Sequence, residues 1–218
     1  METPVETTAV QAEVDPKYKV LRVNNKLRYL IPKRIFDIFV CIIIGLILLL
    51  PILIVALIIR IESPGPAFYK QERLGKNGKI FMMYKFRSMR TDAEKDGPQW
   101  ATVGDPRCTK VGRVIRVWHI DELPQIWNVI KGDMSVVGPR PEREYFYNDF
   151  EKDIPQFRDR LLVAQGLTCI GQVNGCYDLT PAERLAYDVE YINKQSIWTD
   201  IKCMCKTIVV IFNHKGAR

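Results

Sequence analysis

Residues 38–59 read IFVCIIIGLILLLPILIVALII, a run of 22 residues without a charged side chain. A helix of this length extends over ~33 Å, which matches the hydrocarbon thickness of a bilayer. A buried helix of a folded domain is the alternative, but the length and purity of the run favour a membrane segment. It is not a secretory signal, because 37 largely polar residues precede it and no small-residue cleavage site follows.

The charges around this segment indicate how it enters the membrane. Pro51 lies past its middle and removes a backbone hydrogen bond, so we expect a kink or a break there. A single crossing predicts basic residues mainly on one side. Here both flanks are basic, with Lys26, Arg28, Lys33 and Arg34 before the segment and Arg60, Lys70, Arg73, Lys76 and Lys79 after it. We therefore expect a re-entrant helix over residues 33–62, broken near Pro51, with both ends on the cytosolic face.

The rest of the chain predicts one small domain. Residues 1–32 are expected to form a mobile tail, residues 63–212 the main domain and residues 213–218 a short C-terminal tail. Alternating segments at 67–73 and 79–86 flank a glycine-rich turn and predict a β-hairpin. Helical periodicity predicts helices over 121–130, 142–157, 180–191 and 197–212. The apolar stripe of the last helix favours core packing over membrane contact.

The expected fold class is therefore α+β. It comprises a mostly helical cytosolic domain with a small β-hairpin, held at the membrane by the N-terminal re-entrant helix and by interfacial helices.

Composition limits the kinds of partner. The formal net charge of +7 favours acidic ligands, such as phosphorylated small molecules, anionic lipids or nucleic acid. Aromatic residues are not interleaved with basic ones as a nucleic-acid stacking platform requires, so we expect no nucleic acid. The six cysteines form no Cys-x-x-Cys pair and lie near no histidine cluster, which argues against a disulfide scaffold or a zinc site.

Asp121 and Glu122 are the strongest candidates for chemistry. Adjacent acids at the start of a helix are common, because the helix N-terminus stabilises negative charge. These two, however, stand among many cations: Arg107, Lys110, Arg113 and Arg116 come before them, and Lys131, Arg140 and Arg143 follow. Two carboxylates among so many cations suit a site that holds phosphate oxygens together with a divalent metal. A surface salt-bridge network is the competing interpretation.

Further basic residues support a phosphate site. Arg140 stands between two prolines, which pre-set its backbone so that its guanidinium can meet a phosphate with two hydrogen bonds. Lys85 and Arg87 are two residues apart on a predicted strand and should share a face. A basic belt on lipid headgroups is the alternative for these residues. Fingerprints for dinucleotides and for phosphate loops are absent, and His119 and His214 are too far apart for a histidine metal site.

Several motifs together carry a resemblance that covers residues from about Lys33 to Phe212. They are Lys33-Arg34 with Asp37, Ser63-Pro-Gly-Pro-Ala-Phe68, Lys70-Gln-Glu-Arg73 with Gly75, Tyr84-Lys-Phe-Arg-Ser-Met89, Asp121-Glu-Leu-Pro-Gln125, Asn128-Val-Ile-Lys-Gly-Asp-Met-Ser135, Val137-Gly-Pro-Arg-Pro141 and Gly171-Gln-Val-Asn-Gly175. In this order and spacing the chain resembles the bacterial sugar transferase family of small monotopic phosphoglycosyl transferases. The chain departs from the family pattern in three places. Leu50 precedes the helix-breaking proline where serine is usual, and Trp118-His119-Ile120 precede the acidic pair where small hydroxyl residues and leucine are usual. In the stretch 165–170, Gln165 and Cys169 replace proline and glycine.

The resemblance implies a covalent, two-step reaction at the cytosolic face of the bacterial inner membrane. Asp121 would attack the β-phosphate of a UDP-sugar and release UMP, and a polyprenol phosphate would then accept the phosphosugar. Glu122 would help bind Mg²⁺. The substrate-binding residues it implies are Lys70, Gln71, Arg73, Lys85, Arg87, Arg113, Arg116, Arg140 and Pro141.

The same resemblance implies the partners: UDP-sugar, polyprenol (undecaprenyl) phosphate, inner-membrane lipids and downstream glycosyltransferases of capsule, exopolysaccharide, O-antigen or glycoprotein glycan synthesis. The sugar stays open among a diacetamido sugar, galactose, glucose and N-acetylgalactosamine, and a homodimer is left open too. A membrane-tethered scaffold without catalysis is the alternative function.

Overall fold

The structure is a computed structural model that describes residues 16–95, 97, 99, 102, 104–175 and 179–213. Of the expected tails at 1–32 and 213–218, residues 1–15 and 214–218 lie outside the described residues. Residues 27–32 of the expected N-terminal tail belong to the first α-helix. The α-helices and β-strands, in chain order, are α1 (Leu27–Ile47), α2 (Leu49–Glu62), β1 (Phe68–Leu74), β2 (Ile80–Phe86), α3 (Lys110–Val117), α4 (Ile126–Lys131), β3 (Ser135–Val137), α5 (Glu144–Phe150), β4 (Gly166–Thr168), α6 (Ile170–Asn174), α7 (Pro181–Asn193) and α8 (Ile197–Phe212). Four short 3-10 helices complete the list: η1 (Pro16–Tyr18), η2 (Lys76–Gly78), η3 (Ile120–Gln125) and η4 (Pro155–Leu162). This mixture of helices and small sheets confirms an α+β fold.

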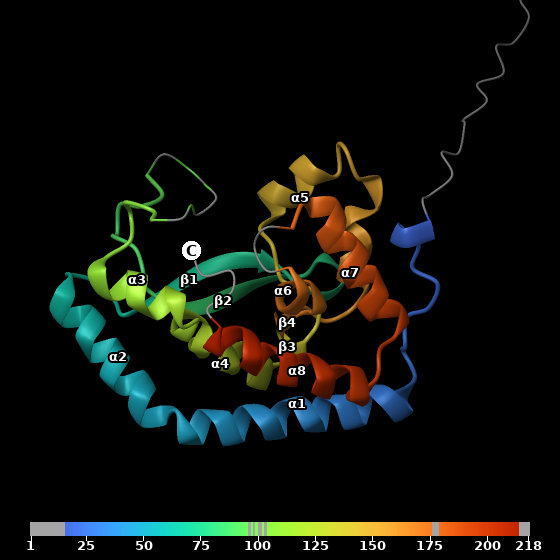
Figure 1. The fold of residues 1–218 in the computed structure, drawn as a ribbon, viewed down its shortest axis with the longest axis horizontal. Helices are drawn as coiled ribbons and strands as arrows, with labels where there is room; N and C mark the ends of the chain where they lie inside the picture. Colours follow the sequence, from blue (N-terminus) through green and yellow to red (C-terminus); the bar gives the residue numbers. More distant parts are fainter. Residues whose placement is uncertain are drawn as a thin grey trace, which may run out of the picture.

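The hydrophobic segment forms two helices, α1 and α2, which meet at an angle of 62° (Figure 1). Pro51 lies in the first turn of α2 and has no N–H to donate to the Ile47 carbonyl, so one helical hydrogen bond is missing at the bend. The break itself is at Leu48, three residues before the proline, and the regular pattern resumes when Ile52 N donates to Leu48 O at 2.8 Å. Within the described residues no single helix is long and apolar enough to cross a membrane, whereas the bent pair passes by length and composition.

The predicted hairpin is present. Strands β1 and β2 pair antiparallel, from Phe68 opposite Phe86 to Leu74 opposite Ile80. The outer edge of β2 is satisfied by one side chain, because the Asn128 amide accepts from Tyr84 N at 3.0 Å and donates to Met82 O at 2.7 Å. Asn128 is fully buried and so acts as a short substitute for a third strand.

A second small sheet was not predicted. β3 and β4 pair in parallel, with Ser135 opposite Gly166 and Val137 opposite Thr168. Their chains run so close that a Cβ on Gly166 would lie 2.1 Å from the nitrogen of Gly138. Glycine is therefore required at this crossing, which positions the Pro139–Pro141 loop.

The helix predictions hold with shifted bounds. The helix expected at 121–130 is η3 followed by α4, and the one expected at 142–157 is α5, with η4 following at Pro155–Leu162. α7 and α8 lie where they were expected. The expectation that the apolar stripe of α8 packs in the core is wrong for Trp198, Ile208 and Phe212, which are exposed. In Figure 1 α8 runs beside α1, with α7 and α5 farther from the α1–α2 pair.

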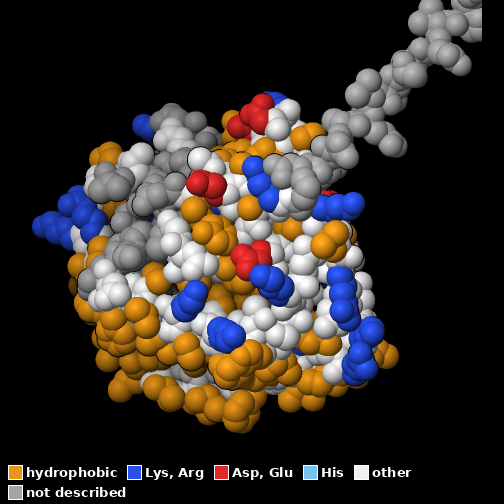
Figure 2. All heavy atoms as spheres, turned by 45° about the vertical axis from the view of Figure 1, so that its right-hand side comes forward, with side chains coloured by type: hydrophobic (Ala, Val, Ile, Leu, Met, Phe, Trp, Pro, Cys, Tyr) orange, Lys and Arg blue, Asp and Glu red, His pale blue; other side chains and the backbone are white. Residues whose placement is uncertain are grey.

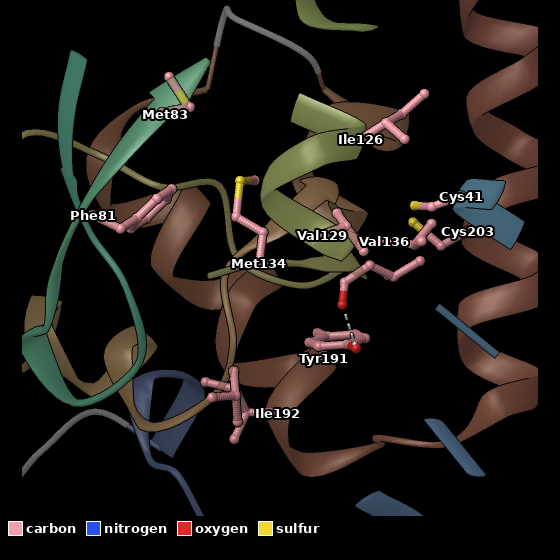
Figure 3. Close-up of a cluster of buried hydrophobic side chains, with 12 residues drawn as sticks. Cys41, Phe81, Met83, Ile126, Val129, Met134, Val136, Tyr191, Ile192 and Cys203 are labelled. Atoms are coloured by element: carbon pink, nitrogen blue, oxygen red, sulfur yellow. Dashed lines mark hydrogen bonds between the residues drawn. The ribbon is translucent and has the colours of Figure 1, made fainter. Parts of the chain in front are cut away.

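The main core joins α1 to the domain (Figure 3). Cys41 of α1 packs in one cluster with Phe81 of β2, Val129 of α4 and Cys203 of α8. Tyr191 of α7 lies in the same cluster and donates from its hydroxyl to Val137 O at 2.9 Å.

A buried polar network reinforces this junction. The Lys33 ammonium lies 2.6 Å from Asp37 Oδ1, 2.6 Å from Ser135 Oγ and 3.2 Å from Asp200 Oδ2. Arg34 donates to the carbonyls of Val129 and Ile130 at the end of α4. The first half of α1 is therefore an integral part of the folded domain.

Candidate active site

A sharp turn introduces the acidic pair. Thr109 caps the start of α3, where its hydroxyl accepts from Gly112 N at 2.9 Å. Two residues after α3 ends at Val117, His119 has a left-handed backbone with φ of 55°. Histidine adopts a left-handed backbone more often than most non-glycine residues, but the conformation still costs free energy. η3 begins at the next residue, Ile120, and contains the acidic pair. Both acids are buried: Asp121 is 9% exposed and Glu122 is 7% exposed.

Glu122 is held by two cations. The Lys85 ammonium donates to Glu122 Oε1 at 3.1 Å, and the Arg140 guanidinium makes a two-bond contact, to Oε1 and, at 3.2 Å, to Oε2. Burial opposes ionisation of Glu122, but the charges of Arg140 and Lys85 outweigh it and hold the pKa of this carboxyl well below its usual value. Glu122 is therefore ionised throughout the physiological range.

Asp121 is in a different electrostatic state. Burial, followed by the charge of Glu122, raises the pKa of Asp121 to about 6, while Lys85, Arg116 and Arg140 oppose the rise. No described residue donates a hydrogen bond to its carboxylate. The pair thus consists of one carboxylate fixed by cations and one that is buried, more basic than usual and open to a ligand.

Both acids line a cleft of about 420 Å³. Of the substrate-binding residues predicted from the sequence, the cleft brings together Gln71, Arg73, Lys85, Arg87, Arg116 and Arg140. Lys70, Arg113 and Pro141 do not line it. Lys70 stacks over the Tyr84 ring at 5.5 Å, Arg113 is exposed on α3, and Pro141 is buried with its carbonyl accepting from Arg73 at 3.2 Å.

Arg87 lines the cleft but most of its donors are used elsewhere. Its guanidinium donates to Ser63 O at 2.8 Å, to Ser63 Oγ at 2.9 Å and to Pro64 O at 2.6 Å. Arg87 therefore stabilises the turn that follows α2 by bonding its carbonyl groups. The sequence placed Arg87 beside Lys85 correctly but could not show that backbone carbonyls some 24 residues away are its partners.

Several residues of the cleft were not predicted as site residues. Glu142 accepts from Arg73 at 3.0 Å and from Arg184 at 3.3 Å. The Glu94 carboxylate accepts a hydrogen bond from the Arg143 guanidinium at 3.0 Å. Glu142 directly follows the Pro-Arg-Pro motif, a signal that could have identified it, whereas Arg184 and Glu94 carry no local motif.

The cleft lies close to the apolar helices, because Arg87 lines it and also bonds to Ser63 directly after α2. Figure 2 shows basic side chains on the face of the protein above a continuous apolar band along its lower edge, the side on which α1 lies in Figure 1. Exposed side chains such as Leu46, Leu50 and Ile61 come from α1 and α2.

A carboxylate pair among arginines beside bent apolar helices agrees with comparison to known proteins. The model of the family described as "Bacterial sugar transferase" matches residues 28–214. The chain belongs to the bacterial sugar transferase family. The resemblance inferred from the sequence motifs is confirmed.

Several relatives of this chain carry related names. The putative undecaprenyl-phosphate N-acetylgalactosaminyl 1-phosphate transferase of Bacillus subtilis is 54% identical over 135 residues, which cover 62% of this chain and 75% of the relative. The UDP-N-acetylgalactosamine-undecaprenyl-phosphate N-acetylgalactosaminephosphotransferase of Aeromonas hydrophila is 43% identical, over 75% of this chain and 39% of the relative. The UDP-glucose:undecaprenyl-phosphate glucose-1-phosphate transferase of Xanthomonas campestris is 41% identical, over 76% of this chain and 35% of the relative. The chain thus spans well under half the length of the latter two proteins.

Proposed function

We propose that this chain transfers a sugar 1-phosphate from a UDP-sugar to a polyprenol (undecaprenyl) phosphate and releases UMP. The observation that carries the proposal is the buried Asp121–Glu122 pair in a cationic cleft, within a chain of this family. The reaction would be the first membrane step in the synthesis of a capsule, exopolysaccharide, O-antigen or glycoprotein glycan, and its product would pass to downstream glycosyltransferases.

Asp121 is the nucleophile in this proposal. Its carboxylate oxygen attacks the β-phosphorus of the UDP-sugar, the bond from that phosphorus to the bridging oxygen breaks, and UMP leaves with the electron pair. A phosphate oxygen of the polyprenol phosphate then attacks the same phosphorus and frees Asp121. The raised pKa suits this role, because a more basic carboxylate is a better nucleophile and is still largely ionised at pH 7. Lys85, Arg116 and Arg140 are placed to stabilise the phosphate charge.

The acidic pair alone supplies too few ligands for Mg²⁺, so the substrate phosphates would have to supply others. No group of three His, Cys, Asp or Glu side chains within the described residues could hold a metal. Of the four acceptor positions of the Glu122 carboxylate, Lys85 and Arg140 occupy three, so one remains on Oε2. Mg²⁺ commonly uses one or two carboxylates plus substrate phosphates. We therefore assign Glu122, with the diphosphate, to Mg²⁺, which when bound would neutralise phosphate charge.

The bent helix pair supports a re-entrant attachment to the cytosolic face of the inner membrane. Peptide tags at residues 1 and 218 should then both be protected from protease in sealed right-side-out vesicles. Digestion of one tag alone would show that the segment spans the membrane.

UMP release tests the activity. The purified protein in detergent is supplied with Mg²⁺, polyprenol phosphate and a panel of UDP-sugars that includes N-acetylgalactosamine, galactose, glucose and a diacetamido sugar. We expect release with at least one sugar, loss of release in Asp121→Asn, and unchanged release in the matched control Asp149→Asn, whose carboxylate is exposed on α5. A labelled phosphosugar should become attached to Asp121 when the acceptor is omitted. Normal turnover by Asp121→Asn would refute the mechanism, and chelation by EDTA without effect would refute the metal assignment.

A further inference from the structure

The backbone that carries Arg140 is held at four consecutive carbonyls. Pro139 O accepts from Gly166 N at 2.8 Å and Glu142 O accepts from Leu74 N at 3.1 Å, so the outer two are bound by backbone groups. The inner two are bound by arginines: Pro141 O by Arg73 at 3.2 Å and Arg140 O by Arg160 at 3.0 Å. A two-bond contact between Arg140 and Glu122 depends on this backbone position, since the side chain extends from it.

Arg160 is the most deeply buried of these supports. Its side chain is 1% exposed, packs against the Phe157 ring with 4.9 Å between the guanidinium carbon and the ring centroid, and pairs with Asp188 at 2.7 Å. Asp188 is itself 3% exposed. A cation buried this deeply requires a counter-ion, so Asp188 keeps Arg160 charged and in place.

Asp188 belongs to α7, which also supplies Arg184 one turn earlier on the same face. Arg184 donates to Glu142 Oε1 at 3.3 Å, two residues after Arg140. One face of α7 therefore contacts the Arg140 loop twice, through Asp188 and Arg160 on one side and through Arg184 and Glu142 on the other.

We propose that Asp188 and Arg160 are positioning residues, which place Arg140 for its contact with Glu122 and with the substrate phosphates. The chain of contacts runs from α7 through Asp188 to Arg160, then to the Arg140 carbonyl, and from the Arg140 guanidinium to Glu122. The effect on catalysis rests on the proposed function, whereas the positioning of Arg140 depends only on the contacts of Asp188 and Arg160. Neither residue touches the acidic pair.

The first test is Asp188→Asn, compared with Val189→Ala. Val189 is the next residue of α7 and is buried in the core, and its apolar side chain cannot form an ion pair or hydrogen bond with Arg160. Both variants should melt at a lower temperature. Only Asp188→Asn should raise the KM for the UDP-sugar, by about tenfold, because Arg160 loses its counter-ion and no longer fixes the Arg140 carbonyl. An unfolded fraction lowers the maximal rate without raising KM, so a structural role alone would leave KM unchanged. Equal KM values in the two variants would overturn the proposal.

The second test is the double variant Arg160→Met/Asp188→Leu, which removes both charges and keeps most of the volume. Replacement of a buried ion pair by apolar residues is often neutral for stability. We therefore expect the melting temperature to recover towards the wild-type value while kcat stays about 100-fold low, since the Arg140 carbonyl has lost its donor. Recovery of kcat together with stability would overturn the proposal.

If the double variant fails to fold, Arg160→Lys takes its place. It keeps a positive charge opposite Asp188, but its shorter side chain does not place a donor at the position of Nη2, the one nitrogen that contacts both Asp188 and the Arg140 carbonyl. A raised KM supports positioning, and wild-type kinetics overturn it.

Failure of the proposed function is distinguishable from failure of this inference. If the wild-type protein releases no UMP from any UDP-sugar, the function is wrong. The positioning role is then decided by crystal structures of the wild type and the Arg160→Lys variant. Displacement of Arg140 from Glu122 in the variant supports it, and an unchanged contact overturns it.

Discussion

Asp121→Asn should make the protein more stable at neutral pH while abolishing its activity. Burial and the neighbouring charge of Glu122 raise the pKa of Asp121 from 3.8 to about 6. A pKa that is higher in the folded than in the unfolded state means that the folded protein binds the proton more tightly. Stability from this group is then complete below about pH 4 and is lost as the pH rises through 6.

The rise in pKa corresponds to about 3 kcal/mol, the cost of keeping an ionised Asp121 buried beside Glu122 at pH 8. Asparagine carries no charge and avoids this cost. Because a chain of this size gains ~2–4 °C per kcal/mol, the variant should melt ~6–12 °C above the wild type at pH 8. At pH 4 the gap should narrow to within ~1 kcal/mol, because Asp121 is then protonated in the folded state and partly protonated in the unfolded state.

The assay is thermal unfolding in detergent with EDTA, at intervals from pH 4 to pH 8. Asp149→Asn is the control, because this exposed carboxylate should change the melting temperature little at any pH. Two results would refute the reasoning: no gain in stability at pH 8, or a gain of the same size at every pH. The first would mean that Asp121 has a favourable partner, and the second that the gain does not come from its charge.

Three further predictions concern the fold and the pH dependence. Asn128→Ala should lower the free energy of unfolding by about 2–4 kcal/mol, because it leaves Tyr84 N and Met82 O unpaired at a part-buried strand edge; a loss below 1 kcal/mol in chemical denaturation would contradict the role of Asn128 as a strand substitute. Arg87→Lys should lower the melting temperature but change the KM for the UDP-sugar by less than about twofold, because the donors of Arg87 are used at the end of α2; a large KM change at an unaltered melting temperature would instead support direct substrate binding. The kcat/KM for UMP release should fall as the pH drops below about 6, where Asp121 becomes protonated, and a flat profile down to pH 4.5 would exclude Asp121 as the ionised nucleophile.

The sequence predicted those parts of the fold that have a local signal. The hairpin follows from two alternating segments around the Gly75–Gly78 turn, where Asn77 and Gly78 adopt positive φ. The ends of α8 follow from the Ser196 cap and the apolar stripe that comes after it. The β3–β4 sheet has strands of only three residues, which are too short to show a period, and its pairing depends on a close approach between Gly138 and Gly166 that only the folded chain reveals.

The site was predicted to a similar extent. The acidic pair and Arg140 could be found because cations and prolines surround them in the chain. The different states of Asp121 and Glu122 could not, because they depend on Lys85 from a distant strand and on the degree of burial. The functions of Arg87 and Arg160 were inaccessible for the same reason, since the partners that bind them are backbone carbonyls supplied by other elements.

The junction between α1 and the domain has a practical consequence for anyone who wishes to produce a water-soluble fragment. Deletion of residues 33–62 would remove Lys33 and Cys41, which leaves Asp200 inside the protein without its cation and opens a void in the main core. Such a truncated chain should be poorly folded rather than merely detached from lipid. Solubilisation should instead keep the whole segment and replace its exposed side chains, such as Leu46, Leu50 and Ile61, with polar ones.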